Sequence, residues 1–243
     1  MLVHPTMQQL KNKKVLITGG GRGIGKAIAL LFSQEGAEVW ITSRSEEQLK
    51  EVVSNIKSQG GIAHALVFDL SQEKDVEKLS TEAQNCNIDI LVNNAGTGFK
   101  GAFFKASTQD MNFTLDVNLR APMLLTKNLL PLFLKKESGV IINIVSIAGK
   151  MGMANSVTYC ASKHGMMGFT HALFEEVREK NIKVAAICPG FVDTPLIPAT
   201  GKIDRSKMIR PEDIAKAALF IATASRESCP IEMTVRPQRS PRT

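Results

Sequence analysis

Aromatic side chains that stack on nucleobases are scarce in this chain, which has one tryptophan and one tyrosine among 243 residues. Proteins that bind single-stranded nucleic acid use such side chains as stacking platforms. The net charge is +7, but residues 1–14 and 236–243 each carry three basic residues and no acidic one, so the rest of the chain is close to neutral. A nucleic-acid-binding domain instead concentrates basic residues on one face of its body. We therefore expect no nucleic-acid partner.

Cysteine pairs and histidine clusters with the spacing of metal ligands are also missing. The four cysteines include no C-x-x-C pair, and the four histidines include no H-E-x-x-H motif. A disulfide framework or a metal site would need such arrangements. We expect no metal ion, and reduced thiols in a cytoplasmic protein.

Long apolar runs are absent as well. No stretch approaches the 18 or so apolar residues that cross a bilayer, and Lys127 and Asn128 interrupt the most apolar long segment, residues 122–134. Residues 1–14 contain no apolar core that would indicate a signal peptide. We expect no membrane association.

The chain does contain a regular alternation of short apolar runs and longer amphipathic segments. The apolar runs predict strands at residues 13–18, 38–42, 62–68, 88–92, 139–146, 182–188 and 231–235. The longest helices are expected at 109–136 and 156–180. Strands of nearly continuous Val, Ile and Leu, each followed by a helix, are typical of a parallel sheet covered on both faces.

The predicted fold class is therefore α/β, with one Rossmann-like, doubly wound domain and a parallel sheet of about seven strands. The domain spans residues 1–243, with a core at 10–235. Residues 1–9 and 236–243 are expected to be flexible flanks.

A glycine-rich turn connects the first predicted strand to the first predicted helix. Residues 18–25 read T-G-G-G-R-G-I-G. Glycines let the backbone turn tightly and approach a pyrophosphate, and the helix that follows offers free N–H groups and the positive end of its dipole. A tight structural loop is the alternative, but the position between strand and helix favours dinucleotide binding. The predicted contacts here are Gly19, Gly21, Arg22, Gly23, Ile24 and Gly25.

The end of the second predicted strand indicates which dinucleotide binds. An acidic residue there would bind the 2′-hydroxyl of NAD, but the chain has Ser43 and Arg44. A guanidinium suits a 2′-phosphate, and a hydroxyl can assist it. We predict NADP(H) as cofactor, with NAD(H) as the alternative if Arg44 is only a solvated loop charge.

The only tyrosine, Tyr159, stands four residues before Lys163. This spacing places both side chains on one face of a helix. A cation beside a phenol lowers the phenol's pKa from about 10 and makes it a usable proton donor and acceptor. The alternative is a tyrosine at a helix start followed by a solvated lysine.

Taken in order, these motifs resemble those of the short-chain dehydrogenase/reductase family in its compact form. The resemblance covers nearly the whole chain, and it is closest to the 3-oxoacyl-[acyl-carrier-protein] reductase branch. It rests on the turn at 18–25, Asp69, the Asn-Asn-Ala-Gly sequence at 93–96, Asn118, Ser146, Tyr159 with Lys163, Pro189-Gly190 and Thr194.

The resemblance implies a role for each residue of the catalytic set. Tyr159 would exchange a proton with the substrate oxygen, which Ser146 would orient. Lys163 would lower the pKa of Tyr159 and bind the nicotinamide ribose, and Asn118 would hold a water that links Lys163 to solvent. The resemblance also implies further cofactor contacts: Asp69 and Leu70 at the adenine, Asn94, Ala95 and Gly96 at the adenosine ribose, and Pro189, Gly190, Val192 and Thr194 at the carboxamide.

The expected function is that of an NADP(H)-dependent oxidoreductase, either a carbonyl reductase or a secondary-alcohol dehydrogenase. One alternative is a 3-oxoacyl-[acyl-carrier-protein] reductase of fatty acid synthesis. Lys135, Lys136 and Lys180 would then form a docking patch for the acidic carrier. A further alternative is a non-catalytic dinucleotide-sensing or scaffold protein on the same fold.

The substrate is expected to be a small carbonyl or alcohol, either free or linked to an acyl carrier. Residues 97–106, 149–156 and 191–208 should line its pocket with apolar side chains: Phe99, Met151, Met153, Phe191, Leu196 and Ile197. No charged residue in these segments is placed to bind a carboxylate, so we expect an uncharged or acyl-like substrate. The C-terminus lacks the Gly-Gly segment that such reductases pack across a tetramer axis, whereas the two long helices predict a homodimer or homotetramer.

Overall fold

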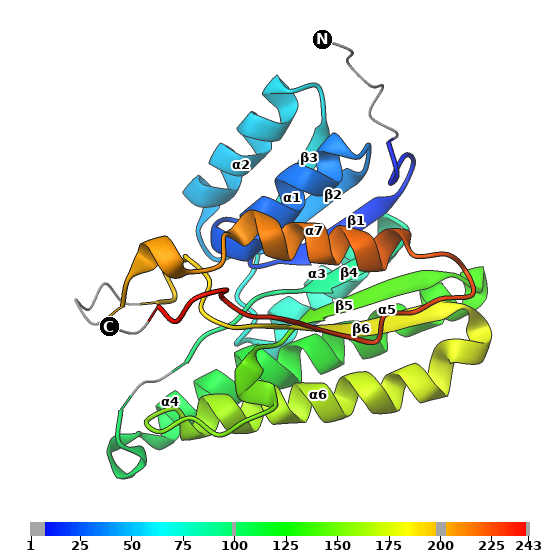
Figure 1. Ribbon diagram of the computed structural model, residues 1–243. Helices are drawn as coiled ribbons and strands as arrows, with labels where there is room; N and C mark the ends of the chain where they lie inside the picture. Colours follow the sequence, from blue (N-terminus) through cyan, green and yellow to red (C-terminus); the bar gives the residue numbers. More distant parts are fainter. Residues whose placement is uncertain (1–7, 99–100, 198–202, 242–243) are drawn as a thin grey trace.

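The computed structural model of the chain, which describes residues 8–98, 101–197 and 203–241, contains one seven-stranded sheet (Figure 1). The strand order is β3-β2-β1-β4-β5-β6-β7, and every neighbouring pair is parallel. The predicted doubly wound sheet is therefore confirmed. Its strands are β1 (Lys14–Thr18), β2 (Glu38–Ser43), β3 (Ile62–Val67), β4 (Ile90–Asn93), β5 (Gly139–Ile144), β6 (Ile182–Pro189) and β7 (Glu232–Val235).

Helices cover both faces of the sheet (Figure 1). One layer consists of α1 (Gly23–Gln34), α2 (Glu46–Ser58) and α7 (Pro211–Thr223), and the other includes α3 (Glu73–Asn85), α5 (Ala121–Lys136) and α6 (Val157–Val177). Successive residues of β1 serve opposite layers: Ile17 packs in the core with Phe32 of α1, and Leu16 packs in the core with Phe133 of α5. All four side chains are fully buried, and each contributes about 1.5–3 kcal/mol to stability. This two-sided burial explains the continuous apolar strand sequences.

The helix predicted as continuous over 109–136 is divided in the structure. It consists of α4 (Thr108–Leu115), a π-helical turn (Asp116–Arg120) and α5. A π turn carries one more residue per turn than an α-helix and is frequent at functional sites. The prediction of one continuous helix was wrong at this point, because the apolar pattern of the sequence continues through the π turn and does not reveal it. The second long helix, predicted to end at residue 180, ends as an α-helix at Val177 and continues as a 3-10 turn.

Because all strands are parallel, their carboxyl ends lie at one edge of the sheet. The strand order reverses direction between β1 and β4, where open α/β sheets bind ligands. Thr18 ends β1, and its hydroxyl accepts hydrogen bonds from the backbone nitrogens of Asn94 and Ala95, both at 3.0 Å. The two halves of the sheet are thereby joined at the point where the predicted site residues lie.

Candidate active site

The glycine-rich turn lies between β1 and α1. Gly19 has a φ of +66°, in the left-handed region that favours glycine. A Cβ on Gly25 would lie 2.3 Å from the carbonyl oxygen of Gly19, so the turn and the helix approach too closely for any side chain. At the helix start, Arg22 makes no side-chain cap, and the first turn of α1 contains no acidic residue. Its free N–H groups and dipole therefore suit a pyrophosphate.

Asn94 holds this turn in place from the neighbouring strand. Its side-chain amide donates to the carbonyl oxygens of Thr18 at 2.8 Å and Gly19 at 3.1 Å. Asn94 was predicted as a ribose contact, and the structure gives it contacts with the turn itself. Ala95 and Gly96 continue the backbone past the same edge of the sheet.

Ser43 ends β2 next to the glycine-rich turn, and Arg44 follows it. The Ser43 hydroxyl oxygen would be 3.3 Å from a Cβ on Gly21. The exposed Arg44 side chain lies over the ring of Phe113, with its guanidinium carbon 5.7 Å from the ring centroid. Nearby Glu46 pairs with Lys50, at 2.7 Å. Among the described residues no acid pairs with Arg44, so its guanidinium remains available to a phosphate.

Asp69 follows β3 at the same edge. One of its carboxylate oxygens accepts from the backbone nitrogen of Ser71 at 3.0 Å and from its hydroxyl at 2.9 Å. The adjacent Leu70 packs against the core beneath α3 and α5. The carboxylate is therefore held in a fixed orientation by Ser71.

The segment after β6 approaches the turn from the other half of the sheet. Thr194 is buried, and its methyl group would lie 3.1 Å from a Cβ on Gly23. Val192 forms an isolated bridge with Ile209. The Gly190 nitrogen donates to the carbonyl oxygen of Val235 at 2.8 Å, which joins the segment that begins at Pro189 to the end of β7. These residues were predicted to hold the carboxamide, and the structure brings Thr194 to the glycine-rich turn.

Tyr159 and Lys163 lie in the first two turns of α6, and Ser146 follows β5. Burial raises the pKa of the Tyr159 phenol, and the nearby Ser146 hydroxyl lowers it by less. The Lys163 ammonium nitrogen is 5.7 Å from the ring centroid of Tyr159 and donates to the carbonyl oxygen of Ile144 at 3.0 Å. Burial lowers the pKa of Lys163 to about 8.

The expected decrease in the pKa of Tyr159 is thus wrong for this structure, in which burial of the phenol leaves it with a raised pKa. The reason is that the Lys163 ammonium is directed to the Ile144 carbonyl. Desolvation disfavours the charged form of each group, so it raises the pKa of the phenol and lowers that of the lysine.

Asn118 lies in the π turn, and its side chain binds the loop after β4. Its amide oxygen accepts from the Thr97 nitrogen at 2.8 Å, and its amide nitrogen donates to the Thr97 carbonyl at 2.7 Å and to the Ser162 hydroxyl at 3.1 Å. A Cβ on Gly96 would lie 3.6 Å from this amide oxygen and 3.8 Å from the Lys163 nitrogen. A Cβ on Gly98 would lie 2.9 Å from the Tyr159 ring. Three of the four predicted catalytic residues, Asn118, Tyr159 and Lys163, therefore meet around the loop at 96–98.

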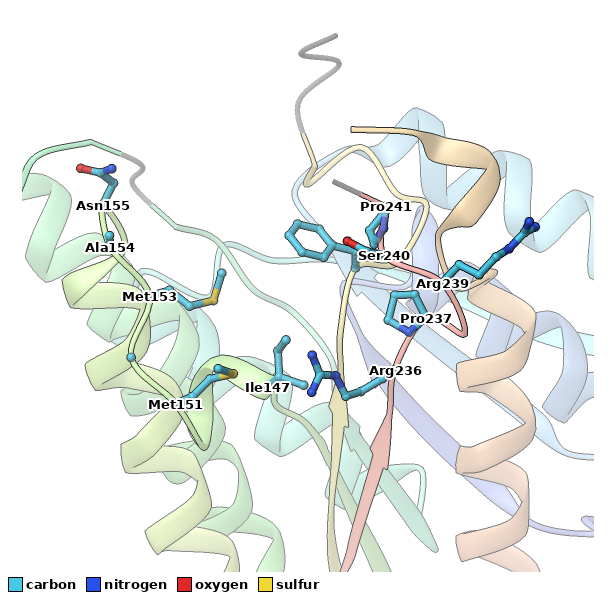
Figure 2. A pocket seen from close by; sticks show the side chains of 12 residues that line it. Ile147, Met151, Met153, Ala154, Asn155, Arg236, Pro237, Arg239, Ser240 and Pro241 are labelled. Atoms are coloured by element: carbon cyan, nitrogen blue, oxygen red, sulfur yellow. The ribbon is translucent and has the colours of Figure 1, made fainter. Parts of the chain in front are cut away.

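A cavity of about 820 Å³ lies between the loop at 147–155 and the C-terminal segment at 236–241 (Figure 2), and its lining begins at Ile147, the residue after Ser146. Three predicted lining residues are present: Met151, Met153 and Phe191. Leu196 and Ile197 are not among its lining residues, and Phe99 lies outside the described residues.

Sequence reasoning missed Arg236 and Arg239, which line the cavity from the C-terminal segment. The expectation of no charged residue concerned the three segments at 97–106, 149–156 and 191–208, and these arginines come from outside them. The signal was present as the basic cluster of residues 236–243, but it was interpreted as part of a flexible flank. Instead, Pro241 is buried, and its carbonyl accepts from the Asp204 nitrogen at 2.8 Å.

Within the described ranges, no three His, Cys, Asp or Glu side chains form a group that could hold a metal ion. In the same part of the chain, none of the helices combines the length and apolarity needed to span a membrane.

Comparison with known proteins agrees with this geometry. The model of the family described as short chain dehydrogenase matches residues 13–203. The 3-oxoacyl-[acyl-carrier-protein] reductase FabG of Aquifex aeolicus is 35% identical over 227 residues, which cover 88% of this chain and 92% of the relative. Ketoacyl reductase HetN of a Nostoc species is 34% identical over 218 residues, covering 88% of this chain and 76% of the relative.

Two solved structures share the fold. A proposed NAD(P)-dependent gluconate 5-dehydrogenase of Beutenbergia cavernae, with NADP bound at low occupancy, has a TM-score of 0.88 and 31% identity, covering 95% of this chain and 98% of that one. A metagenomic short-chain oxidoreductase in complex with NADP has a TM-score of 0.84 and 33% identity, covering 96% and 100%. From the sequence match, the shared structure and the site together, this chain belongs to the short chain dehydrogenase family of oxidoreductases.

Proposed function

We propose that the protein is an NADP(H)-dependent oxidoreductase that interconverts a carbonyl and a secondary alcohol. The observation that supports this most strongly is the pairing of Tyr159 with the buried Lys163, whose nitrogen lies 5.7 Å from the ring centroid and donates to the Ile144 carbonyl, two residues before Ser146, at the edge where the glycine-rich turn lies. A hydroxyl pair and a buried ammonium beside a dinucleotide turn provide a proton donor next to a hydride carrier.

In this proposal Tyr159 protonates the substrate oxygen during reduction. Burial raises the pKa of the phenol, so the group holds its proton at neutral pH before the transfer. Ser146 donates a hydrogen bond to the same substrate oxygen and orients it, as a preorganised donor does for a developing oxyanion. Lys163, with a pKa of about 8, is mostly protonated at neutral pH and can return a proton to Tyr159.

Asn118 acts in this proposal as a positioning residue. Its amide engages both backbone groups of Thr97, and therefore fixes the loop that contacts Tyr159. The bound water that the family resemblance implies would link Lys163 to solvent past this asparagine.

The residues at the turn fit a phosphorylated dinucleotide. The uncapped start of α1 suits the pyrophosphate. Arg44 and Arg22 are exposed cations near the end of β2, and the last residue of β2 is a serine, not an acid. The two solved neighbours bind NADP. When bound, the cofactor supplies the hydride, and Asp69, Leu70, Gly96 and Thr194 would hold its other parts.

A second candidate is reduction of 3-oxoacyl groups on an acyl carrier, the activity by which the Aquifex relative is named. The predicted docking patch is weaker than the sequence suggested, because the Lys136 ammonium is bound to Asp89 at 2.9 Å and to two backbone carbonyls. Among the lysines proposed for the patch, this leaves Lys135 and Lys180 for a carrier. We therefore favour a small substrate.

The four cysteines are free thiols, which supports a reducing compartment such as the cytoplasm. On α5, Met123 and Leu134 are large apolar side chains that are about two-fifths exposed, at 41% and 38%. Exposed apolar side chains on this long helix support the predicted subunit interface, which would form a homodimer or one of the interfaces of a homotetramer.

The test is Tyr159→Phe, assayed by NADPH oxidation with oxoacyl thioesters, small ketones, quinones and steroids. Loss of the phenolic proton should reduce kcat by about 10²–10⁴-fold, while the Kd for NADPH stays unchanged because the ring is retained. Unaltered turnover in the variant would reject the proposed role. NADPH binding by the wild type without turnover of any compound would favour a dinucleotide sensor instead.

A further inference from the structure

The C-terminal segment gives the cavity a positively charged wall. Arg236 and Arg239 are the charged residues that line it, and no acidic residue does. Figure 2 shows the Arg236 side chain extending from this segment toward Ile147, across the cavity from Met151 and Met153. Neither arginine has a hydrogen-bond or ion-pair partner among the residues that the structure describes.

The backbone that carries the two arginines is held on both sides. Before them, the Gly190 nitrogen donates to the Val235 carbonyl at 2.8 Å, and a Cβ on Gly190 would lie 2.8 Å from the Pro237 ring. After them, the Pro241 carbonyl accepts from the Asp204 nitrogen, also at 2.8 Å. Proline fixes φ at Pro237, between the two arginines. The guanidinium groups are thus carried on an anchored segment.

Acids of the two strand ends that flank this segment already have other partners. Glu232 of β7 pairs with Lys150, and Asp193 pairs with Arg205. Two unpaired arginines therefore line a cavity whose other lining includes Ile147, Met153 and Phe191. Figure 2 shows that the Arg236 side chain points toward Ile147, whereas the Arg239 side chain points away from it. An arginine presents a planar fork that binds a carboxylate through two parallel hydrogen bonds.

We infer that the substrate is an oxo acid whose carboxylate binds Arg236, assisted by Arg239, while its carbonyl faces Ser146 and Tyr159. Ile147 lines the cavity and directly follows Ser146, so an anion near Ile147 lies within the length of a small molecule from the reacting oxygen. The methionines and Phe191 would cover the carbon chain between the two groups. This inference rests on the proposed function and names its substrate class.

The experiment compares unbranched six-carbon oxo acids, with the ketone at carbon 2, 3, 4 or 5, with their methyl esters under saturating NADPH. The wild type should prefer the acid at one or more of these positions. Arg236→Gln should lower kcat/KM for that acid by about ten- to hundredfold, mainly through KM, because a charged hydrogen-bond pair is lost. The variant should leave kcat/KM for the ester unchanged, and Arg239→Gln should show a smaller loss.

Arg226→Gln is the matched control. It also removes one positive charge, but Arg226 donates to the Asn181 side chain just before β6, at the opposite edge of the sheet. It should leave both acid and ester kinetics unchanged.

Equal use of acid and ester by the wild type, or an equal loss for both in Arg236→Gln, would overturn the carboxylate site and leave the proposed function standing. If the wild type instead shows a preference only for oxoacyl phosphopantetheine over the dephosphorylated form of that substrate, the arginines bind a phosphate. This result would also overturn the carboxylate site.

A binding measurement tests the site without turnover. Hexanoate should raise the melting temperature of the enzyme with NADP more than methyl hexanoate does, and this difference should vanish in Arg236→Gln. No difference in the wild type would contradict the inference even if Tyr159→Phe had already disproved the proposed chemistry.

Discussion

At the scale of single residues, Lys163 is a costly component of this protein. Its side chain is 4% exposed, and its ammonium has one hydrogen bond, to the Ile144 carbonyl, with no described carboxylate paired to it. Burial therefore lowers its pKa from 10.5 to about 8. An apolar side chain would fill the same space without this desolvation cost, which is consistent with a role for the charge in catalysis.

This cost predicts a pH dependence of stability. Between pH 8 and pH 10.5 the unfolded chain binds a proton at Lys163 that the folded protein has lost, so the free energy of unfolding rises with pH across this window. Relative to Lys163→Met, the wild type should gain about 3 kcal/mol over that range. The difference between the two proteins should be constant below about pH 7, where Lys163 is protonated in both the folded and the unfolded state. Urea unfolding of both proteins from pH 6 to pH 10.5 measures it.

A difference that stays flat across the whole range would contradict the lowered pKa. The comparison with Lys163→Met matters because other groups also titrate in this range, and subtracting the variant removes their contributions.

At the scale of elements, the sequence predicted the central strands well because β1, β4, β5 and β6 are buried on both sides. The apolar residues of β1 serve the α1 layer and the α5 layer in alternation, so no polar residue interrupts the run. The glycine-rich turn was also predictable, because its requirement for glycine is local. A side chain at Gly25 would clash with the carbonyl oxygen of Gly19, six residues earlier.

Two elements could not be predicted in this way. The π turn at Asp116–Arg120 continues the apolar pattern of its neighbours, and Asn118 acquires its role from Thr97, which is 21 residues away. The course of residues 236–241 depends on contacts with Gly190 and Asp204, which are distant in sequence. Local sequence patterns carry no information about such pairings.

The turn and helix unit gives a test of its own. In Gly25→Ala, the new Cβ would overlap the Gly19 carbonyl at 2.3 Å and the Asn94 amide at 2.5 Å. Relief of this overlap must displace the turn, so stability should fall by about 1–3 kcal/mol, and the Kd for NADPH should rise at least about tenfold. Chemical denaturation and NADPH fluorescence titration measure the two effects.

Gly152→Ala is the control for this variant, because a Cβ there meets no atom within 4 Å. It should leave both the free energy of unfolding and the Kd for NADPH unchanged. Normal NADPH binding by Gly25→Ala would show that the turn does not approach the dinucleotide.

At the scale of the whole molecule, the site is assembled from both halves of the sheet. β1 and β2 supply the turn and Arg44, whereas β5, α6 and the segment after β6 supply Ser146, Tyr159 and Thr194. The parallel arrangement brings these segments to one edge of the sheet (Figure 1). The C-terminal segment adds the cavity wall (Figure 2). The central claim is that a single bound dinucleotide spans these two halves with its reactive end at Tyr159.

The most direct test of this claim is an experimental structure of the protein with NADP bound. The account predicts the pyrophosphate at the start of α1, the 2′-phosphate at Arg44, and the nicotinamide ribose within hydrogen-bond distance of the Lys163 nitrogen, about 3 Å, so that the Tyr159 hydroxyl faces the nicotinamide. A dinucleotide bound elsewhere, or bound at the turn with its nicotinamide out of reach of Tyr159, would contradict it.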